Sequence, residues 1–270
     1  MKDSNHTMFE EYIRKVRQSG KQYFTTLNAL RELKVSKDAF YAGVFRLKKK
    51  GNIVSPSQGL YIIVPPENFN MGCIPAEDLV PILMKDIPYY AGLLTASLYH
   101  GASHQKPQVF QVVTSRRMPS VLCGKIKIDF IHKKNTETLP LNTITVKSGY
   151  LNISSPELTV YDLLYYPYAC GGLNNIATIL SELIEEIDPQ RLIKFIHSQN
   201  QHVWVQRLGY ILENIETFHD EKKEQIMELL DAYLKGRTCR FFPLDPHLPL
   251  EGRRRNKRWH IIENRIIESD

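Results

Sequence analysis

The sequence predicts an α+β protein with a small N-terminal domain and a larger α+β domain that has a small sheet and an α-rich end. In the first quarter of the chain, three helical periodicities precede a pair of β-rich runs, and further helical periodicities surround a second group of β-rich runs. The length of 270 residues fits one or two domains. We predict domains at residues 1–66 and 67–236, then a Pro-rich and basic C-terminal arm at residues 237–270 that packs on the second domain.

Positive charge is concentrated in the first predicted domain. Residues 1–66 hold twelve Lys or Arg and five Asp or Glu, a net charge of +7. The other 23 basic and 24 acidic residues of the chain give a net charge of −1. Neutralisation of phosphate groups requires such a concentration of charge, although a solvated basic face without a partner is the alternative that charge alone leaves open.

The overall composition is that of an ordinary globular protein, with 43% apolar and 24% charged residues. No stretch approaches the roughly 20 apolar residues of a membrane-spanning helix, and the polar first residues lack the apolar core of a signal peptide. We therefore expect a cytoplasmic protein without a membrane partner. The widely spaced cysteines form no CxxC pair, which favours buried, inert thiols over a zinc ribbon or disulfide framework. They are Cys73, Cys123, Cys170 and Cys239.

Three helices are expected before the first β-rich run. Residues 7–18 carry apolar side chains at helical spacing, and Thr25 or Thr26 is suited to cap a second helix with leucines on one face. Ser36 caps a third helix. The apolar stripe of this third helix faces inward and consists of Phe40, Val44 and Leu47.

A hairpin follows the third helix, since Gly51 ends the helix and residues 52–64 hold two β-rich runs around a turn-forming tip. This order of elements matches a winged helix-turn-helix, whose third helix enters the major groove while the hairpin wing lies over the DNA backbone. An alternative is that the same fold serves protein contacts only. The outward Phe45 is not explained by a DNA-facing surface. The predicted DNA-binding residues are Ser36, Lys37, Tyr41, Arg46, Lys48, Lys49, Lys50, Ser57 and Gln58.

The second domain is predicted to begin after a linker at residues 66–74, where Pro65-Pro66 breaks secondary structure. Alternation and β-branched enrichment predict strands at 109–114, 125–132, 143–147 and 150–154. Ser155, with Pro156 and Glu157 after it, marks a helix start. Helices are expected at 76–86, 89–100, from 156, from 172 to about 187, and near 189–198, 201–217 and 220–235.

The C-terminal arm has a basic character of its own. Residues 237–260 hold seven basic and two acidic side chains, and Trp259, Ile261 and Ile262 are suited to a last strand. The arm is either a second phosphate contact or a surface extension packed on its own domain. Its basic cluster is Arg253, Arg254, Arg255, Lys257 and Arg258.

No constellation of catalytic residues stands out, so we predict no enzyme activity, no cofactor and no metal site. Phosphate-binding glycine motifs are missing, and His100 and His104 are separated by the helix-ending Gly101. A metal-dependent nuclease is the competing hypothesis. It would use Asp129 beside Lys125 and Lys127, with the later Glu157 and Asp162, but a single strand carboxylate is a poor Mg²⁺ site.

The second domain resembles the AbiEi antitoxins of bacterial type IV toxin–antitoxin, or abortive infection, systems. The most specific motifs are Ser-Pro-Glu at 155–157 followed by Asp-Leu-Leu at 162–164, and Arg-Leu-Gly-Tyr-Ile-Leu-Glu at 207–213. Further matching stretches include Gly171-Gly172-Leu173, and the Lys-Gly and Gly-Leu-Tyr segments of the predicted wing match as well. The resemblance covers most of residues 20–235.

This resemblance implies an antitoxin of phage defence that represses its own operon by binding promoter repeats through the winged helix. It implies that the C-terminal domain counteracts a nucleotidyltransferase-like toxin encoded next door, without requiring a stable complex. Asp162 and Arg207 lie at recurrent positions of the family pattern, and Glu157 lies in its Ser-Pro-Glu motif. Each of the three has a role either in antitoxicity or inside the domain. A regulator that responds to a ligand and has no toxin partner is a further alternative.

Overall fold

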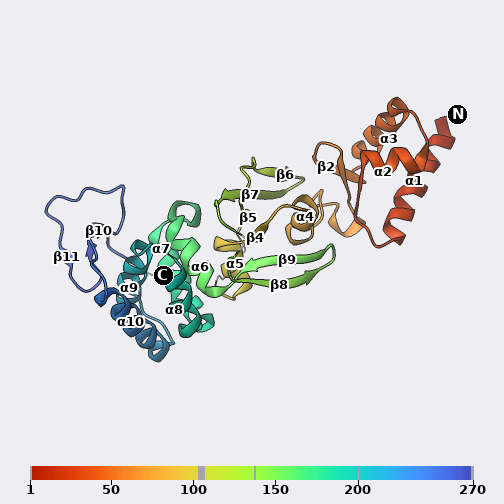
Figure 1. Ribbon diagram of the computed structural model, residues 1–270. Coiled ribbons are helices and arrows are strands. Elements are labelled where there is room, and N and C mark those ends of the chain that lie inside the picture. Colours follow the sequence, from red (N-terminus) through yellow and green to blue (C-terminus); the bar gives the residue numbers. More distant parts are fainter. Residues whose placement is uncertain (1, 103–106, 137, 200, 269–270) are drawn as a thin grey trace. The chain divides into compact units, whose positions relative to one another are not determined.

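The computed structural model describes residues 2–102, 107–136, 138–199 and 201–268, and its elements form the α+β fold that the sequence predicts (Figure 1). The chain divides into two compact units. The first unit comprises Met1–Tyr90, Gln108–Glu137 and Thr143–Asn152, and the second comprises Ala91–Pro107, Thr138–Asn142 and Ile153–Asp270. These units are defined by contacts rather than by chain order, so the segment boundaries at residues 66 and 236 stay a prediction.

The first unit begins with three helices and a hairpin, in the predicted order. The structure adds a short strand, β1, which the sequence analysis missed. This strand pairs antiparallel with β3, which gives a three-stranded sheet in the order β1-β3-β2. The elements are α1 (Lys2–Gln18), β1 (Tyr23–Thr25), α2 (Thr26–Leu33), α3 (Lys37–Lys49), β2 (Ile53–Ser57) and β3 (Leu60–Ile63).

Side-chain caps fix where α2 and α3 begin. The Thr25 hydroxyl accepts a hydrogen bond from the backbone N–H of Asn28, and the Ser36 hydroxyl accepts one from Ala39 at 3.2 Å. Each cap satisfies a backbone donor that the first turn of a helix leaves unpaired, which is worth about 1 kcal/mol. The predicted cap at Ser36 is confirmed, and the structure selects Thr25 over Thr26 for α2.

The inner face of α3 is packed into the core of this region. Phe40, Val44 and Leu47 are buried, as predicted from the apolar stripe. Gly43 allows α1 to approach, because a Cβ atom at this position would lie 2.5 Å from the Phe9 ring. Since one face of α3 is fully used by this packing, only its opposite face is left for a partner.

A six-stranded sheet follows, in the order β6-β7-β5-β4-β9-β8. Strand β5 pairs with β7 in parallel, and β6 pairs with β7 antiparallel. All four predicted strands are confirmed, and β4 and β6 are additional. The elements of this part are the 3-10 turn η1 (Pro66–Asn68), α4 (Ala76–Leu83), β4 (Tyr89–Ala91), α5 (Leu93–Tyr99), β5 (Phe110–Thr114), β6 (Val121–Cys123), β7 (Ile126–His132), β8 (Leu141–Val146) and β9 (Gly149–Ser154).

The helix predicted over 89–100 is wrong at its start, because residues 89–91 form strand β4 and the helix begins only at Leu93. Tyr90 and Ala91 are both fully buried, and β4 lies between β5 and β9 within the sheet. A strand in such a position lacks the alternation that would distinguish it from a buried helix. The predicted helix at 76–86 is also shorter in the structure and ends at Leu83.

The second unit is rich in helices, as predicted. Helix α6 is buried along almost its whole length, from Glu157 to Leu164. The C-terminal arm adds a small sheet in the order β10-β12-β11. Its elements are α6 (Pro156–Tyr165), η2 (Pro167–Cys170), α7 (Leu173–Leu183), η3 (Ile184–Glu186), α8 (Pro189–Ser198), α9 (Val203–Glu213), α10 (Asp220–Lys235), β10 (Phe242–Pro243), β11 (Arg255–Asn256) and β12 (Ile261–Ile262). Across the described residues, every helix is too short or too polar to cross a membrane.

Candidate functional site

The outer face of α3 and the hairpin tip carry the candidate DNA-binding residues. All nine side chains are exposed in the structure, including Tyr41, of which 53% is accessible to solvent. Ser36 lies at the N-cap of α3, whereas Arg46, Lys48 and Lys49 lie in its last turn. The sequence thus places a polar cap at one end of the helix and a cluster of cations at the other, on a face that the core does not use.

Lys48 of α3 and Lys50, the C-cap residue of this helix, make contacts within this region. The Lys50 ammonium lies 3.4 Å from a carboxylate oxygen of Glu10, and both side chains are about half exposed. The Lys48 ammonium lies 5.4 Å from the centre of the Tyr61 ring. Exposed ion pairs contribute about 0–1 kcal/mol, so a phosphate group can replace Glu10 at small cost.

The hairpin tip is held against the start of α2. The backbone N–H of Thr26 donates a hydrogen bond of 2.9 Å to the carbonyl of Gly59, which has a positive φ of 77°. Glycine adopts this conformation without a steric cost, so it suits the turn between β2 and β3. Ser57, the last residue of β2, and Gln58, in the turn, are exposed next to this backbone contact.

Phe45 and Tyr41 are exposed aromatic side chains four residues apart on α3, and therefore on one face of the helix. Phe45 is 69% exposed. A side chain with this exposure contributes little to the fold, so the packing of α3 does not account for Phe45.

Glu157 links the N-terminal ends of two helices of the second unit through hydrogen bonds. One carboxylate oxygen accepts a hydrogen bond of 2.7 Å from the Ser155 hydroxyl, and the other accepts one of 3.1 Å from the backbone N–H of Asp188. Ser155 is the N-cap of α6 and Asp188 is the N-cap of α8. Because Glu157 is 2% exposed and both oxygens are engaged, its internal role is the one that the geometry supports.

Asp162 is fully buried among tyrosines of the same unit. Burial, followed by the nearby Tyr165 and Asp162, raises the pKa of Tyr161 to about 12. Burial followed by Asp162 also raises the pKa of Tyr166. The Tyr161 and Tyr166 hydroxyls therefore stay protonated at neutral pH and lie near the Asp162 carboxyl group.

Arg207 lies half-buried on α9 and faces the C-terminal arm. Its guanidinium donates a hydrogen bond of 3.4 Å to the carbonyl of Pro243. Burial lowers the pKa of Arg207, while the nearby Asp245 and Tyr168 act in the opposite direction. Asp245 itself forms an ion pair of 2.9 Å with Arg265. Arg207 thus belongs to a polar cluster between the helices and the arm of its own unit.

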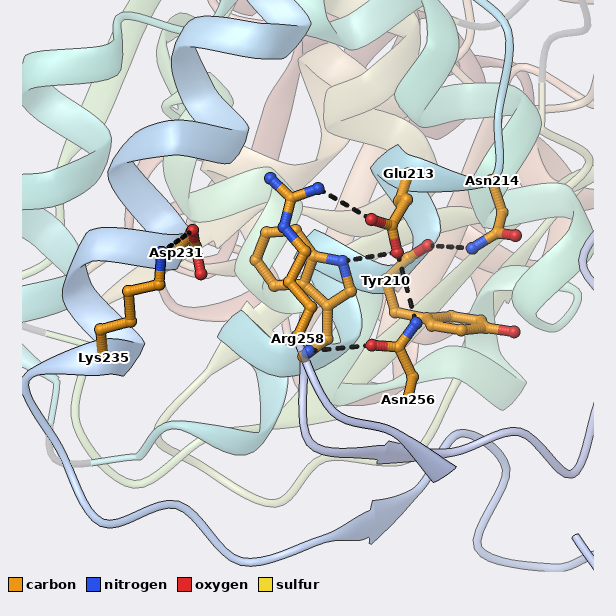
Figure 2. A network of polar contacts seen from close by, with 8 residues as sticks. Tyr210, Glu213, Asn214, Asp231, Lys235, Asn256 and Arg258 are labelled. Carbon is orange, nitrogen blue, oxygen red and sulfur yellow. Dashed lines mark hydrogen bonds and ion pairs between the residues drawn. The ribbon is translucent and has the colours of Figure 1, made fainter. Parts of the chain in front are cut away.

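The C-terminal arm is anchored to α9 through Glu213 (Figure 2). One oxygen of this carboxylate accepts a hydrogen bond from Trp259 at 2.9 Å and one from Asn256 at 3.3 Å, and the other oxygen forms an ion pair with Arg258 at 2.8 Å. The sequence analysis missed this anchor. Glu213 closes the Arg-Leu-Gly-Tyr-Ile-Leu-Glu motif, but nothing in the motif indicates a partner in the arm.

Trp259 completes the anchor by packing on a glycine. Its side chain is fully buried, and a Cβ atom on Gly209 would lie 2.1 Å from the indole ring. Glycine within a helix costs about 1 kcal/mol relative to alanine, which the close approach of Trp259 explains here. A glycine inside an otherwise strong helical pattern was the one sequence signal for this contact.

The five basic residues of the arm are exposed, yet three of them have partners in the same unit. Besides the ion pair of Arg258 with Glu213, Arg254 lies 3.8 Å from Glu263, and Arg255 lies over the Phe241 ring. These contacts support a structural role for part of the arm and reduce the charge that it offers to a ligand.

The described residues contain no group of three or more His, Cys, Asp or Glu side chains arranged to hold a metal ion. His100 donates a hydrogen bond of 2.8 Å to the carbonyl of Ser154, whereas His104 lies outside the described residues. Asp129 forms an exposed ion pair with Lys127 at 3.6 Å. It belongs to the first unit, whereas Glu157 and Asp162 belong to the second.

Comparisons with known proteins agree with this architecture. Residues 90–214 match a family model described as the AbiEi antitoxin C-terminal domain. The crystal structure of the RV2827C protein from Mycobacterium tuberculosis is similar, with a TM-score of 0.66 and 15% sequence identity over 95% of this chain and 91% of that chain. No curated protein sequence matches the chain. The structural similarity shows a common fold over nearly the whole chain.

Proposed function

We propose that this chain is an antitoxin that also represses its own operon, because residues 90–214 match the family model of the AbiEi antitoxin C-terminal domain. The domain supports the antitoxin role directly. On the family resemblance, the toxin is a nucleotidyltransferase-like protein encoded next to it, and no stable complex is needed. Such a protein acts in the cytoplasm, where the DNA of its operon lies, and the proposal assigns it no catalytic role.

In this proposal, α1, α2, α3 and the β2–β3 hairpin form a winged helix-turn-helix that binds promoter DNA. The single observation that carries it is the division of α3 into two faces. Phe40, Val44 and Leu47 are buried in the core, while all the cationic and polar candidates stay exposed. A helix anchored by one face and cationic on the other is suited to enter the major groove, with lysines at its end against phosphates.

A binding assay with the DNA upstream of the chain's own gene tests the repressor half. We expect a complex that weakens steeply with salt, because each neutralised phosphate releases counterions. The variant Lys48→Ala/Lys49→Ala/Lys50→Ala should bind all sequences more weakly. A control with the same charge change, Lys194→Ala/Lys222→Ala/Lys235→Ala on α8 and α10, should bind like the wild type. Absence of any salt-sensitive complex would overturn the DNA-binding half.

A growth assay tests the antitoxin half separately. Cells that express the neighbouring nucleotidyltransferase-like gene are expected to stop growing and to recover when the full chain is co-expressed from an unrelated promoter. The triple α3 variant should still restore growth, because the antitoxin domain lies outside α3. If the chain fails to restore growth while the gene is toxic, the antitoxin assignment is wrong, whatever the DNA-binding result.

A further inference from the structure

Two cysteines that lie far apart in the sequence meet in the first unit. The sulfur atoms of Cys73 and Cys123 are 2.7 Å apart, although 50 positions separate the residues. Cys73 lies within the predicted linker at residues 66–74, and Cys123 is the last residue of β6. The side chains are 0% and 1% exposed. Sequence spacing gave no indication of this pair, which is why all four thiols were expected to be inert.

The two backbones are held together beside the sulfur atoms. The backbone N–H of Lys125 donates a hydrogen bond of 2.8 Å to the carbonyl of Met71. Gly124 has a positive φ of 60°, and a Cβ atom there would lie 2.2 Å from the same carbonyl oxygen. Only glycine permits such an approach. The sulfur atoms are therefore brought together by packed backbone rather than by the chance orientation of flexible side chains.

The chemistry of the pair favours oxidation over metal binding. A structural metal site needs about four ligands, and no cluster of three ligating side chains occurs among the described residues. The hydrogen bond to Cys123, followed by burial, raises the pKa of Cys73, so its thiol is protonated at neutral pH. Two thiol groups in contact form a disulfide by losing two electrons and two protons.

We propose that Cys73 and Cys123 are an oxidation site that closes to an intramolecular disulfide and fastens the segment after residue 72 to β6. The inference is independent of the proposed function. It needs an oxidant small enough to reach buried sulfur, and hydrogen peroxide is the class that fits. A disulfide bond of about 2.05 Å requires only a short further approach of the two sulfur atoms.

The reaction balances with one molecule of peroxide. One thiol loses its proton and its thiolate attacks a peroxide oxygen, so that the O–O bond breaks and a sulfenic acid and a hydroxide form; the hydroxide takes up the released proton and becomes water. The second thiol also loses its proton, and its thiolate attacks the sulfenic sulfur. The S–S bond forms, the S–O bond breaks, and the leaving hydroxide takes up that proton as a second water. The two sulfur atoms are oxidised and the two peroxide oxygens are reduced. Because both sulfur atoms are buried, the reaction should be slow.

Peptide mapping of the oxidised wild-type chain tests the proposal without any variant. The full chain is incubated with hydrogen peroxide, its remaining thiols are alkylated in denaturant, and its peptides are analysed by mass spectrometry with and without a reductant. We expect a linked pair of peptides that contain Cys73 and Cys123, lighter by two hydrogen atoms and released by reductant. Recovery of both cysteines as separately alkylated or over-oxidised peptides would overturn the proposal.

Matched variants and melting temperatures sharpen the result. Cys170→Ser removes a buried thiol elsewhere and should still lose two thiols on oxidation, whereas Cys123→Ser should form no disulfide. The oxidised wild type should melt several degrees higher than the reduced form, because the bond closes a long loop and restricts the unfolded chain. Links that involve Cys170 or Cys239 instead, or no reductant-sensitive shift in melting, would contradict the assignment.

Discussion

Helix α3 and helix α9 both carry residues that the sequence singles out, but they place them in opposite surroundings. The cations at the C-terminal end of α3 are exposed, and Lys50, its C-cap residue, forms an ion pair with an equally exposed Glu10. The polar residues of α9 are engaged by the C-terminal arm, as Glu213 shows with its contacts to Trp259 and Arg258. Charged residues are therefore exposed to solvent in one region and hold the fold together in the other.

The surroundings of a charged residue indicate what its substitution should change. Removing one member of a buried pair of polar groups destabilises the fold, whereas removing an exposed charge has little effect on stability and affects only the binding of a ligand. Glu157 and Arg207 belong to the first kind. Lys49 belongs to the second. We expect substitutions in the second unit to act through stability and those on α3 to act through binding.

The largest expected effect is that of Trp259→Ala, which removes a fully buried ring from Gly209 and leaves a cavity. The free energy of unfolding should fall by roughly 3–5 kcal/mol, measured by urea denaturation. Phe45→Ala removes another aromatic ring, but from the exposed face of α3, and should change stability by no more than about 0.5 kcal/mol. Equal decreases in the free energy of unfolding for the two variants would contradict the expected difference between the two regions.

Glu157→Ala should have a smaller effect, of about 1–3 kcal/mol, because the Ser155 hydroxyl and the Asp188 N–H lose their acceptor. Glu224→Ala on the exposed surface of α10 is the matched control and should leave the free energy of unfolding nearly unchanged. Restoration of growth by Glu157→Ala should decrease only in proportion to the decrease in the fraction of folded protein. A variant that keeps full stability but no longer restores growth would assign Glu157 to antitoxicity itself.

The substitution Asp245→Asn should have the smallest effect on the free energy of unfolding, and this effect should depend on pH. Burial alone would raise the pKa of Asp245, but the His247 N–H, Arg265 and Tyr168 outweigh it and hold the pKa below the ordinary 3.8. A carboxyl group whose pKa is lower in the folded state stabilises the fold at pH values above its ordinary pKa. This contribution to the free energy of unfolding is lost as the pH falls through the lowered pKa. The stability difference between wild type and Asp245→Asn should therefore shrink below about pH 4. Melting curves from pH 6 to pH 2 check this, and a constant difference would refute it.

Much of the first region was predictable because its signals are local. The Ser36 cap, the apolar stripe of α3 and the hairpin all follow from residues within a few positions of one another. Strand β1 was missed because three residues carry too little alternation to be recognised. The exposure of the predicted DNA-binding set follows from the same periodicity, since the residues off the apolar stripe must face outward.

The contacts of the second unit were not predictable, because they join residues far apart in the chain. Glu213 meets the arm 46 positions later at Trp259, and the family motif alone does not indicate this. Strand β4 was predicted as helix because a buried apolar run has no distinctive period. Only Gly209, a helix breaker within a helical pattern, hinted that another group comes close.

The most direct test of the central claim is the salt dependence of promoter binding by the full chain and by its triple α3 variant. The slope of log affinity against log salt reports the number of phosphate contacts, at about 0.9 for each. If Lys48, Lys49 and Lys50 contact phosphates, the variant should show a slope shallower by up to about three such contacts, with an unchanged free energy of unfolding. Identical slopes for wild type and variant would show that the exposed charge of α3 does not bind DNA.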